Sequence, residues 1–143
     1  MARSTFYSHY NDKEDLIDRG LAQLFDKLSE GMNEDSRDTV VPAYGLFEHV
    51  YENRVAAAGL DLYFMSSKFN TYSVNIARRQ LGKQNYGGLR EERLEVMAQT
   101  VGGALVALLI SWVRTGMKTK PAIMAELFYN SLSDIGTIVQ RKN

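Results

Sequence analysis

The apolar positions of this sequence recur every three or four residues in five stretches, which is the spacing of an α-helix with one buried face. Short polar segments separate the stretches, and each of the two prolines stands where a helix can begin. The pattern therefore predicts an all-α fold. The expected helices span residues 12–30, 42–58, 60–84, 90–116 and 121–139. Within the third, the dense apolar run of residues 60–65 fits a helix or a strand by its periodicity, and its helical surroundings favour the helix.

The stretch from Arg90 to Gly116 is apolar nearly all round, above all between Val96 and Val113. A helix of this kind must be buried on several sides, in protein or in lipid. Its apolar length lies at the lower edge of a membrane span, and Gln99 and the Gly102–Gly103 pair lower its hydrophobicity. We therefore expect no membrane insertion. The central helix of a monomeric bundle and a helix shared with a second copy both remain open.

A stripe of small residues favours the second copy. Gly103 and Ala107 lie four residues apart on one face, with Thr100 and Ser111 near the same stripe. Small side chains allow two helix backbones to approach closely. These four residues are therefore predicted to belong to a homodimer interface, and Gly116 is predicted to end the helix in a left-handed conformation.

Composition excludes several classes of protein. The chain has 143 residues, the length of one domain, and its formal net charge is +0, so any contact with DNA must come from a local patch. It has no cysteine, which excludes disulfides and thiolate chemistry. Met1–Tyr10 lacks the apolar centre of a signal peptide, so we expect a cytoplasmic protein.

No pattern of catalytic or metal-binding residues is found. The histidines, His9 and His49, are far apart in the sequence, and Glu48 points away from its neighbour His49 on a helix. No nucleophile and base can be paired, and the Gly102–Gly103 pair lacks the strand and turn of a phosphate loop. The sequence predicts neither an enzyme nor a cofactor or metal site.

Large aromatic residues gather in the middle helices. Such residues, together with Met65, are typical of the lining of an apolar ligand site, although each one singly also suits a core. We predict that they bind a small, largely apolar effector, with Trp112 either closing the pocket or lying in the dimer interface. The predicted ligand-binding residues are Phe47, Tyr51, Tyr63, Phe64, Phe69, Tyr72 and Trp112.

The run from Arg3 to Leu16 (RSTFYSHYNDKEDL) resembles the end of the DNA-binding helix-turn-helix of TetR-family transcriptional repressors. The residues that match the family pattern are Tyr7, Tyr10, Lys13, Glu14 and Leu16. Later in the chain, Gly-Ala-Leu, six residues to Trp112, Gly116 and a final helix with Met-Ala-Glu-Leu are similar to the C-terminal half of such regulators.

The resemblance implies two parts: residues 1–11 as a remnant of the recognition helix, and residues 12–143 as a TetR-like effector-binding and dimerisation bundle. Contacts with DNA would come from Arg3, Ser4, Thr5, Tyr7, His9 and Lys13. The alternative is that Arg3, His9 and Lys13 are solvated charges. The last two helices would pair with their copies, which adds Leu127, Leu132 and Ile135 to the predicted interface.

The function implied is that of a TetR-like repressor that releases DNA when a small molecule binds. The family's first two helices would precede Met1, so we expect binding to an operator only by a longer form of the chain. The alternative is a helical dimerisation module or small-molecule carrier that does not bind DNA.

Overall fold

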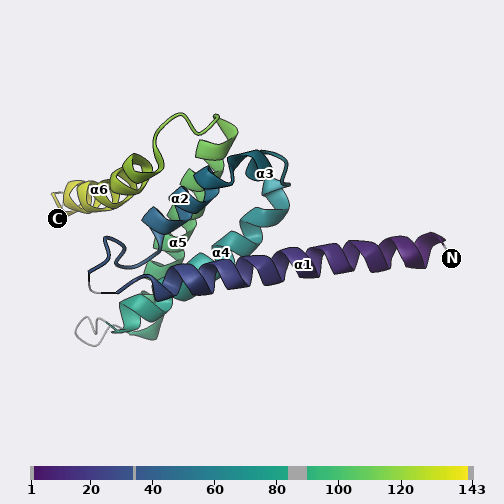
Figure 1. Cartoon of the computed structure of the whole chain (residues 1–143). Coiled ribbons are helices and arrows are strands. Elements are labelled where there is room, and N and C mark those ends of the chain that lie inside the picture. Colours follow the sequence, from purple (N-terminus) through teal and green to yellow (C-terminus); the bar gives the residue numbers. More distant parts are fainter. Residues whose placement is uncertain (1, 34, 84–89, 142–143) are drawn as a thin grey trace.

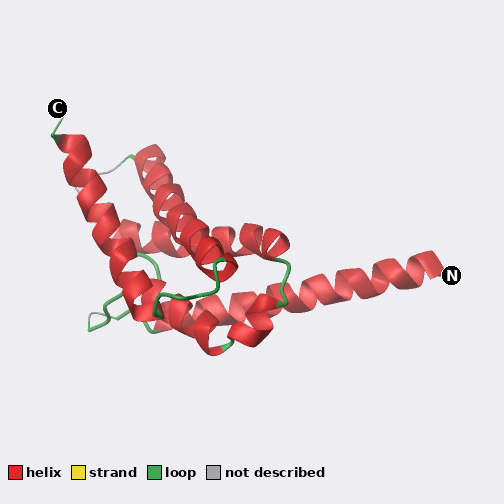
Figure 2. Ribbon diagram, turned by 90° about the horizontal axis from the view of Figure 1, so that it is seen from above, coloured by secondary structure: helices red, strands yellow, loops and turns green. Residues whose placement is uncertain are grey.

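The computed structural model describes residues 2–33, 35–83 and 90–141, with side chains from Lys13 onward. These residues form helices and connecting segments without strands, which confirms the predicted all-α class (Figures 1 and 2). The helices are α1 (Ala2–Glu30), α2 (Ala43–Glu52), α3 (Arg54–Ala58), α4 (Leu62–Lys83), α5 (Glu91–Arg114) and α6 (Pro121–Gln140).

The helices α4 and α5 form the most extensive contact in the fold, because Gly102 lets their backbones meet. A Cβ atom at Gly102 would lie 2.7 Å from Val74 Cγ2 and 2.9 Å from the Val74 backbone nitrogen. The buried face of α5 consists of Ala98, Gly102, Leu105, Val106, Leu109 and Trp112. At the outer edge of the pair, Arg78 Nε donates a hydrogen bond to Glu95 Oε2 over 2.6 Å.

The helix α2 packs on α5 and α6 through one apolar face. Phe47 is fully buried, and its ring meets the edge of Trp112 with 5.2 Å between ring centroids. On α6, Phe128 is 1% exposed. α2 therefore links the central pair to α6, which lies on the far side of the body from the N-terminus (Figure 1).

The helix α1 packs on α4 with its C-terminal half. Phe25 stacks on Tyr72 at 5.5 Å and meets Phe69 edge-on at 5.7 Å between ring centroids. The Tyr72 hydroxyl donates a hydrogen bond to Asp18 Oδ1 over 2.8 Å. The N-terminal half of α1 projects away from the other helices (Figures 1 and 2).

The predicted start of a helix at Asp12 is wrong, although Asn11 before it is a residue type that often caps a helix. α1 runs without interruption from Ala2 through both residues. No proline or glycine interrupts residues 2–19, and a short capping signature does not break a helix whose preceding residues can also be helical.

The other predicted boundaries are close to those observed. Pro42 precedes α2 instead of opening it, and the single helix expected over residues 42–58 is divided at Asn53. Gly59 follows α3, as expected. α6 begins at Pro121, and Gly116 after α5 has φ +92°, the left-handed conformation that the sequence predicted.

By length and composition, α5 meets the criteria for a membrane span, with a mean hydropathy of 1.8. The apolar core helix of a soluble protein meets the same criteria, and 33% of this window is buried against other helices of the described fold. The apolar stretch is therefore weak evidence for a membrane.

Candidate functional site

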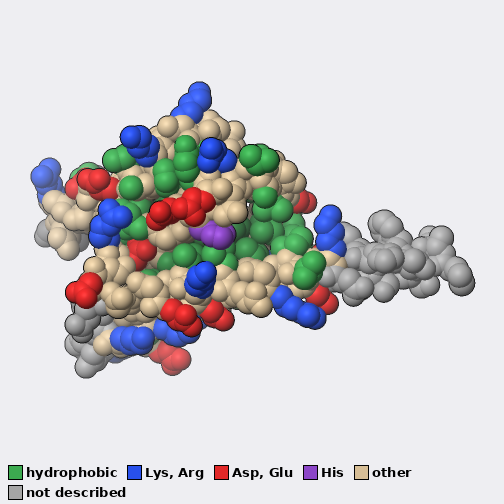
Figure 3. Space-filling view, in the orientation of Figure 1, with side chains coloured by type: hydrophobic (Ala, Val, Ile, Leu, Met, Phe, Trp, Pro, Cys, Tyr) green, Lys and Arg blue, Asp and Glu red, His purple; other side chains and the backbone are tan. Residues whose placement is uncertain are grey.

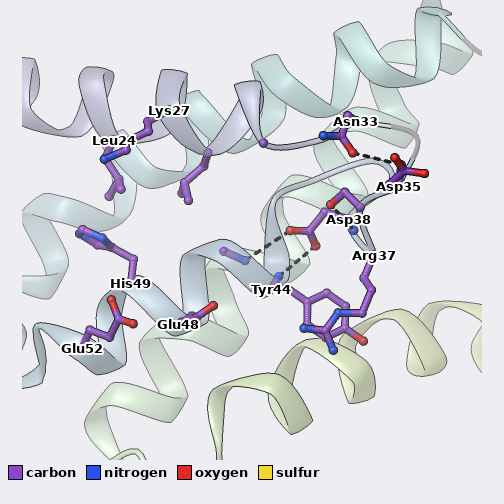
Figure 4. A pocket seen from close by; sticks show the side chains of 14 residues that line it. Leu24, Lys27, Asn33, Asp35, Arg37, Asp38, Tyr44, Glu48, His49 and Glu52 are labelled. Atoms are coloured by element: carbon purple, nitrogen blue, oxygen red, sulfur yellow. Dashed lines mark hydrogen bonds between the residues drawn. The ribbon is translucent and has the colours of Figure 1, made fainter.

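A cavity of about 680 Å³ opens between the C-terminal end of α1, the segment 31–42 and α2 (Figure 4). Its volume lies within the range of small-molecule sites, roughly 300–1,000 Å³. The side chains around it come from all three elements: Leu24, Lys27 and Leu28 from α1, Asn33, Asp35, Ser36, Arg37 and Asp38 from the segment, and Tyr44, Glu48, His49 and Glu52 from α2.

Asp38 organises the wall of this cavity. Its carboxylate accepts hydrogen bonds from the backbone N–H groups of Tyr44 (2.9 Å) and Gly45 (3.3 Å), which begin α2. These amides at the start of a helix have no partner within the helix. Asp38 is 8% exposed, and burial raises its pKa, although the hydrogen bonds from Tyr44 and Tyr129 act in the opposite direction. The segment is therefore fixed to α2 by a buried acid.

Tyr129 of α6 holds the same segment from the other side. Its hydroxyl oxygen lies 2.9 Å from Asp38 Oδ1 and 2.6 Å from the Val41 carbonyl oxygen. Burial, with the Asp38 carboxylate next to it, raises the pKa of Tyr129. Tyr44 stacks on the Tyr129 ring at 6.0 Å, and the Arg37 guanidinium lies 4.0 Å from the Tyr44 ring centroid. The cavity wall is thus connected to α6.

The seven predicted ligand-binding residues do not line one cavity. Phe47 and Trp112 form a buried cluster with Tyr51, whose ring centroid lies 6.3 Å from that of Trp112. The Trp112 indole donates a hydrogen bond to the Thr119 carbonyl oxygen over 2.8 Å.

The remaining four predicted residues lie on α4. Phe69 and Tyr72 pack on Phe25, and Tyr63 is 84% exposed. Phe64 lines a smaller cavity of about 260 Å³ beside Ile17. Packing thus places Phe69 and Tyr72 where α4 meets α1, and Phe47, Tyr51 and Trp112 where α2 meets α5, a division that the sequence pattern alone does not specify.

The predicted interface residues lie mostly on exposed surface. Thr100, Ala107 and Ser111 of α5 are exposed, and Gly103 is half-buried, with Asn70 Oδ1 the nearest atom, at 3.8 Å, to a Cβ placed there. Leu127 and Ile135 of α6 are 51% and 59% exposed, and Leu132 is half-buried. Further large aliphatic side chains are exposed on the same two helices: Val96, Leu108, Ile123, Ile138 and Val139.

Five of the six predicted DNA-contacting residues lie where only the backbone is described. Arg3, Ser4, Thr5, Tyr7 and His9 fall within α1, and their side chains lie outside the described residues. Lys13 is exposed and lines the cavity that contains Phe64. Their contact with DNA stays a prediction of the sequence.

The comparison with known families identifies the chain. Residues 43–134, from the first turn of α2 into α6, match the sequence model of a TetR-type transcriptional regulator C-terminal region. No curated protein and no solved structure matches the chain. Because the match covers well over half of the sequence and the helical fold agrees with it, the chain belongs to the TetR family of transcriptional regulators.

Proposed function

We propose that this chain is the effector-binding and dimerisation part of a transcriptional repressor, in which a small molecule at the cavity beside α1 weakens binding to operator DNA. The observation that carries this proposal is the continuity of α1. The helix begins in the segment that resembles a recognition helix, residues 1–11, and its last turns form one wall of the cavity through Leu24, Lys27 and Leu28.

A continuous helix can transmit a displacement from the cavity to the DNA-binding end. At a rise of about 1.5 Å per residue, about 30 Å of helix separates Leu24 from the start of α1. A molecule that separates α1 from α2 would tilt α1 about its contacts with α4. These contacts are the packing of Phe25 on Tyr72 and the hydrogen bond from the Tyr72 hydroxyl to Asp18. A tilt of a few degrees then moves the N-terminal end by a few ångströms.

Such a movement matters because paired recognition helices must lie about one turn of DNA apart, roughly 34–36 Å. The effector changes DNA affinity only by the difference between its own affinities for the two conformations. The proposal therefore requires that the effector prefer the conformation in which α1 is displaced.

The pairing of recognition helices requires a dimer. The exposed aliphatic side chains of α5 and α6 support a homodimer formed by these two helices, because contiguous apolar surface on a soluble protein marks a site of association. The predicted stripe of Thr100, Gly103, Ala107 and Ser111 lies on the exposed side of α5.

The test is a fluorescence anisotropy titration with DNA from the region upstream of the gene. It compares this chain with a form extended at the N-terminus so that the helix-turn-helix is complete. We expect Kd values of about 10⁻⁸ M or tighter for the extended form and about 10⁻⁴ M for the chain as given. Nanomolar binding by the short form contradicts the assignment of residues 1–11 as a remnant. Absence of DNA binding by both forms, with small-molecule binding retained, favours the carrier.

A further inference from the structure

Three cavities on one flank of α1 join into a single groove. The cavity of about 680 Å³ shares Leu24, Lys27 and His49 with a second of about 390 Å³. The second shares Ile17 and Met65 with the third, of about 260 Å³. We call this surface the α1 groove. It follows α1 from Lys13 to Gly31, about 27 Å at the helical rise.

Figure 3 shows the α1 groove as a hollow between α1 and the rest of the body, with hydrophobic side chains on its floor and a histidine at its edge. The side of the groove opposite α1 consists of the start of α4 and one side of α2. The groove is therefore long and narrow, bounded by helices on both sides.

The middle of the α1 groove is apolar. Its floor contains Leu21 and Met65, which are 6% and 4% exposed, and Ile17 and Leu24 flank them. At Gly20, α1 has no side chain to occupy the groove, and a Cβ atom there would meet nothing within 4 Å. An extended aliphatic chain can bury its methylene groups along such a floor, and each buried methylene favours binding.

The end of the groove beside the segment 31–42 is acidic. Its lining contains four carboxylates, from Asp35, Asp38, Glu48 and Glu52, but only two basic side chains, Lys27 and Arg37. The Arg37 guanidinium lies over the Tyr44 ring, and among the described residues no ion pair involves Glu48 or Glu52.

The end of α1 adds to the negative electrostatic potential of this end of the groove. The helix ends at Glu30, and Gly31 lines the cavity. The C-terminus of a helix carries a partial negative charge and favours cations. The carboxylates of Asp35, Glu48 and Glu52 and the end of α1 thus act in the same direction at one end of an apolar channel, while the Asp38 carboxylate is bound to the positively polarised first amides of α2.

We propose that the α1 groove binds a single-chain aliphatic cation, a long-chain amine or quaternary ammonium compound. The chain lies along α1 over Leu24, Leu21 and Ile17, and the cationic head lies beside Glu48 and Glu52. The proposal specifies the class of effector for the function proposed above, and it rests on that function only for its effect on DNA, because binding can be measured without DNA.

The first test is calorimetry of the unmutated chain with dodecyltrimethylammonium below its micellar concentration. The comparison compounds are hexyltrimethylammonium, dodecyl sulfate and a neutral dodecyl maltoside. We expect saturable binding of the dodecyl cation, a gain of about threefold to fourfold in affinity for each methylene that enters the groove, and at least tenfold weaker binding of dodecyl sulfate. Equal affinity for the two dodecyl ions, or no dependence on chain length, would overturn the proposal.

The second test uses variants that change the groove but not the fold. Gly20→Leu fills the apolar middle, and Gly82→Leu is the matched control because it places the same side chain on α4, where the nearest atom to a Cβ is 4.0 Å away. We expect at least tenfold weaker binding for Gly20→Leu and no change for Gly82→Leu. The double variant Glu48→Gln/Glu52→Gln should retain chain-length dependence and lose the preference for the cation.

Circular dichroism establishes that each variant is folded, and if Gly20→Leu is not, the chain-length series on the unmutated protein decides. Unchanged binding by a folded Gly20→Leu protein overturns the groove assignment. Groove binding that leaves the DNA titration unchanged supports this proposal and contradicts release through α1. Release of DNA by another compound, without binding of the dodecyl cation, overturns only the inference about the ligand.

Discussion

At the scale of single residues, the Asp38 carboxylate connects three parts of the protein. It binds the first free amides of α2, it accepts the Tyr129 hydroxyl of α6, and it faces the cavity beside α1. A buried carboxylate is costly unless hydrogen bonds satisfy it. Asp38 therefore determines how the segment 31–42 lies, and with it the shape of one end of the α1 groove.

We expect Tyr129→Phe to lower the free energy of unfolding by about 1–3 kcal/mol, because it leaves buried acceptors without their donor. The substitution should also raise the pKa of Asp38 further, because the hydrogen bond from Tyr129 lowers it. Urea denaturation measures the first effect, and carbon NMR of the Asp38 carboxyl measures the second. Tyr63→Phe is the control, since that ring is 84% exposed and its substitution should change neither quantity. Equal effects of the two variants would contradict the role given to Tyr129.

The sequence contains little that indicates this arrangement. Asp38 stands in a polar stretch with other acids, and its partner Tyr129 comes ninety-one residues later. The aromatic residues of the middle helices could be identified as buried or ligand-lining, but their division into a cluster around Phe25 and one around Trp112 depends on which helices pack together. Helical periodicity indicates which face is buried and does not indicate against which neighbour.

At the scale of secondary-structure elements, the contact between α4 and α5 depends on one glycine of an adjacent pair. Gly102 faces Val74 at a distance that admits no Cβ atom, whereas the nearest atom to a Cβ at Gly103 is Asn70 Oδ1 at 3.8 Å. The two glycines thus differ in their surroundings, although the sequence presents them side by side. From the sequence we predicted that Gly103 lets helices of two copies approach closely. The sequence did not indicate that Gly102 lets α5 approach α4 within one chain.

We expect Gly102→Ala to lower the free energy of unfolding by about 1–3 kcal/mol, because the methyl group forces α4 and α5 apart. Gly103→Ala adds the same methyl group with ordinary contacts, and it should leave stability unchanged or raise it by about 0.5–1 kcal/mol, because alanine favours a helix. Urea denaturation of the two variants beside the parent protein provides the comparison. Similar losses at both positions would show that Val74 does not determine the effect.

The hydrogen bonds between Arg78 of α4 and Glu95 of α5 lead to a prediction about pH. They lower the pKa of Glu95 from the ordinary 4.5 to about 2. A carboxyl with a lowered pKa in the folded state stabilises the fold fully above its unfolded pKa, and this contribution is lost as the pH falls from 4.5 towards 2.

Arg78→Ala should return the pKa of Glu95 towards its ordinary value. The free energy of unfolding of this variant should be lower than that of the parent above pH 4.5, and the difference should shrink as the pH falls towards 2. NMR titration and denaturation at several pH values measure both effects. Arg93→Ala, which removes an exposed arginine of α5, is the control. A Glu95 that titrates at its ordinary pKa in the parent protein would contradict the prediction.

The boundaries of α5 and α6 could be predicted because a glycine or proline and the apolar periodicity indicate nearly the same residues there. The extent of α4 could be predicted because its apolar periodicity lies between Gly59 and the glycine pair at positions 87 and 88 of the sequence. The beginning of α1 could not, since an acceptable capping sequence at Asn11 competes with a helix that continues through it. The division at Asn53 was missed for a related reason. Asn53 interrupts the helix for a single residue, and its backbone N–H donates hydrogen bonds to the carbonyl oxygens of His49 and Tyr51. The apolar spacing therefore continues almost unchanged across the interruption.

At the scale of the whole molecule, α5 and α6 bury only part of their apolar surface within one chain. α6 packs mainly on α2, and its residues after Leu132 are exposed, including Ile135, Ile138 and Val139. The sequence indicated this surplus through the all-round apolarity of residues 96–113. It could not indicate the α1 groove, because the groove is formed by three elements whose relative placement comes from packing alone.

The surplus of apolar surface leads to the prediction that the chain forms a homodimer through α5 and α6. An obligate interface of this kind buries about 2,000 Å² or more in total. Light scattering at micromolar concentration should give twice the mass of the chain. Ile135→Asp should shift the protein to monomer, because it places a charge in an apolar interface that excludes water.

Val55→Asp is the matched control, since Val55 is 88% exposed on α3 and lies on neither of the two helices. Gly103→Leu tests the close approach of the backbones between the two copies. It should weaken the dimer with a smaller loss of stability than Gly102→Ala, because the nearest atom to a Cβ at Gly103 is the side-chain Asn70 Oδ1 at 3.8 Å, whereas a Cβ at Gly102 meets the Val74 backbone nitrogen at 2.9 Å. A monomeric mass for the unmutated chain, or dissociation by Val55→Asp to the same extent as by Ile135→Asp, would contradict this interface. A monomeric mass would also mean that the spacing of paired recognition helices is not the quantity that an effector controls, whereas equal dissociation by the two variants would place the interface elsewhere on the surface.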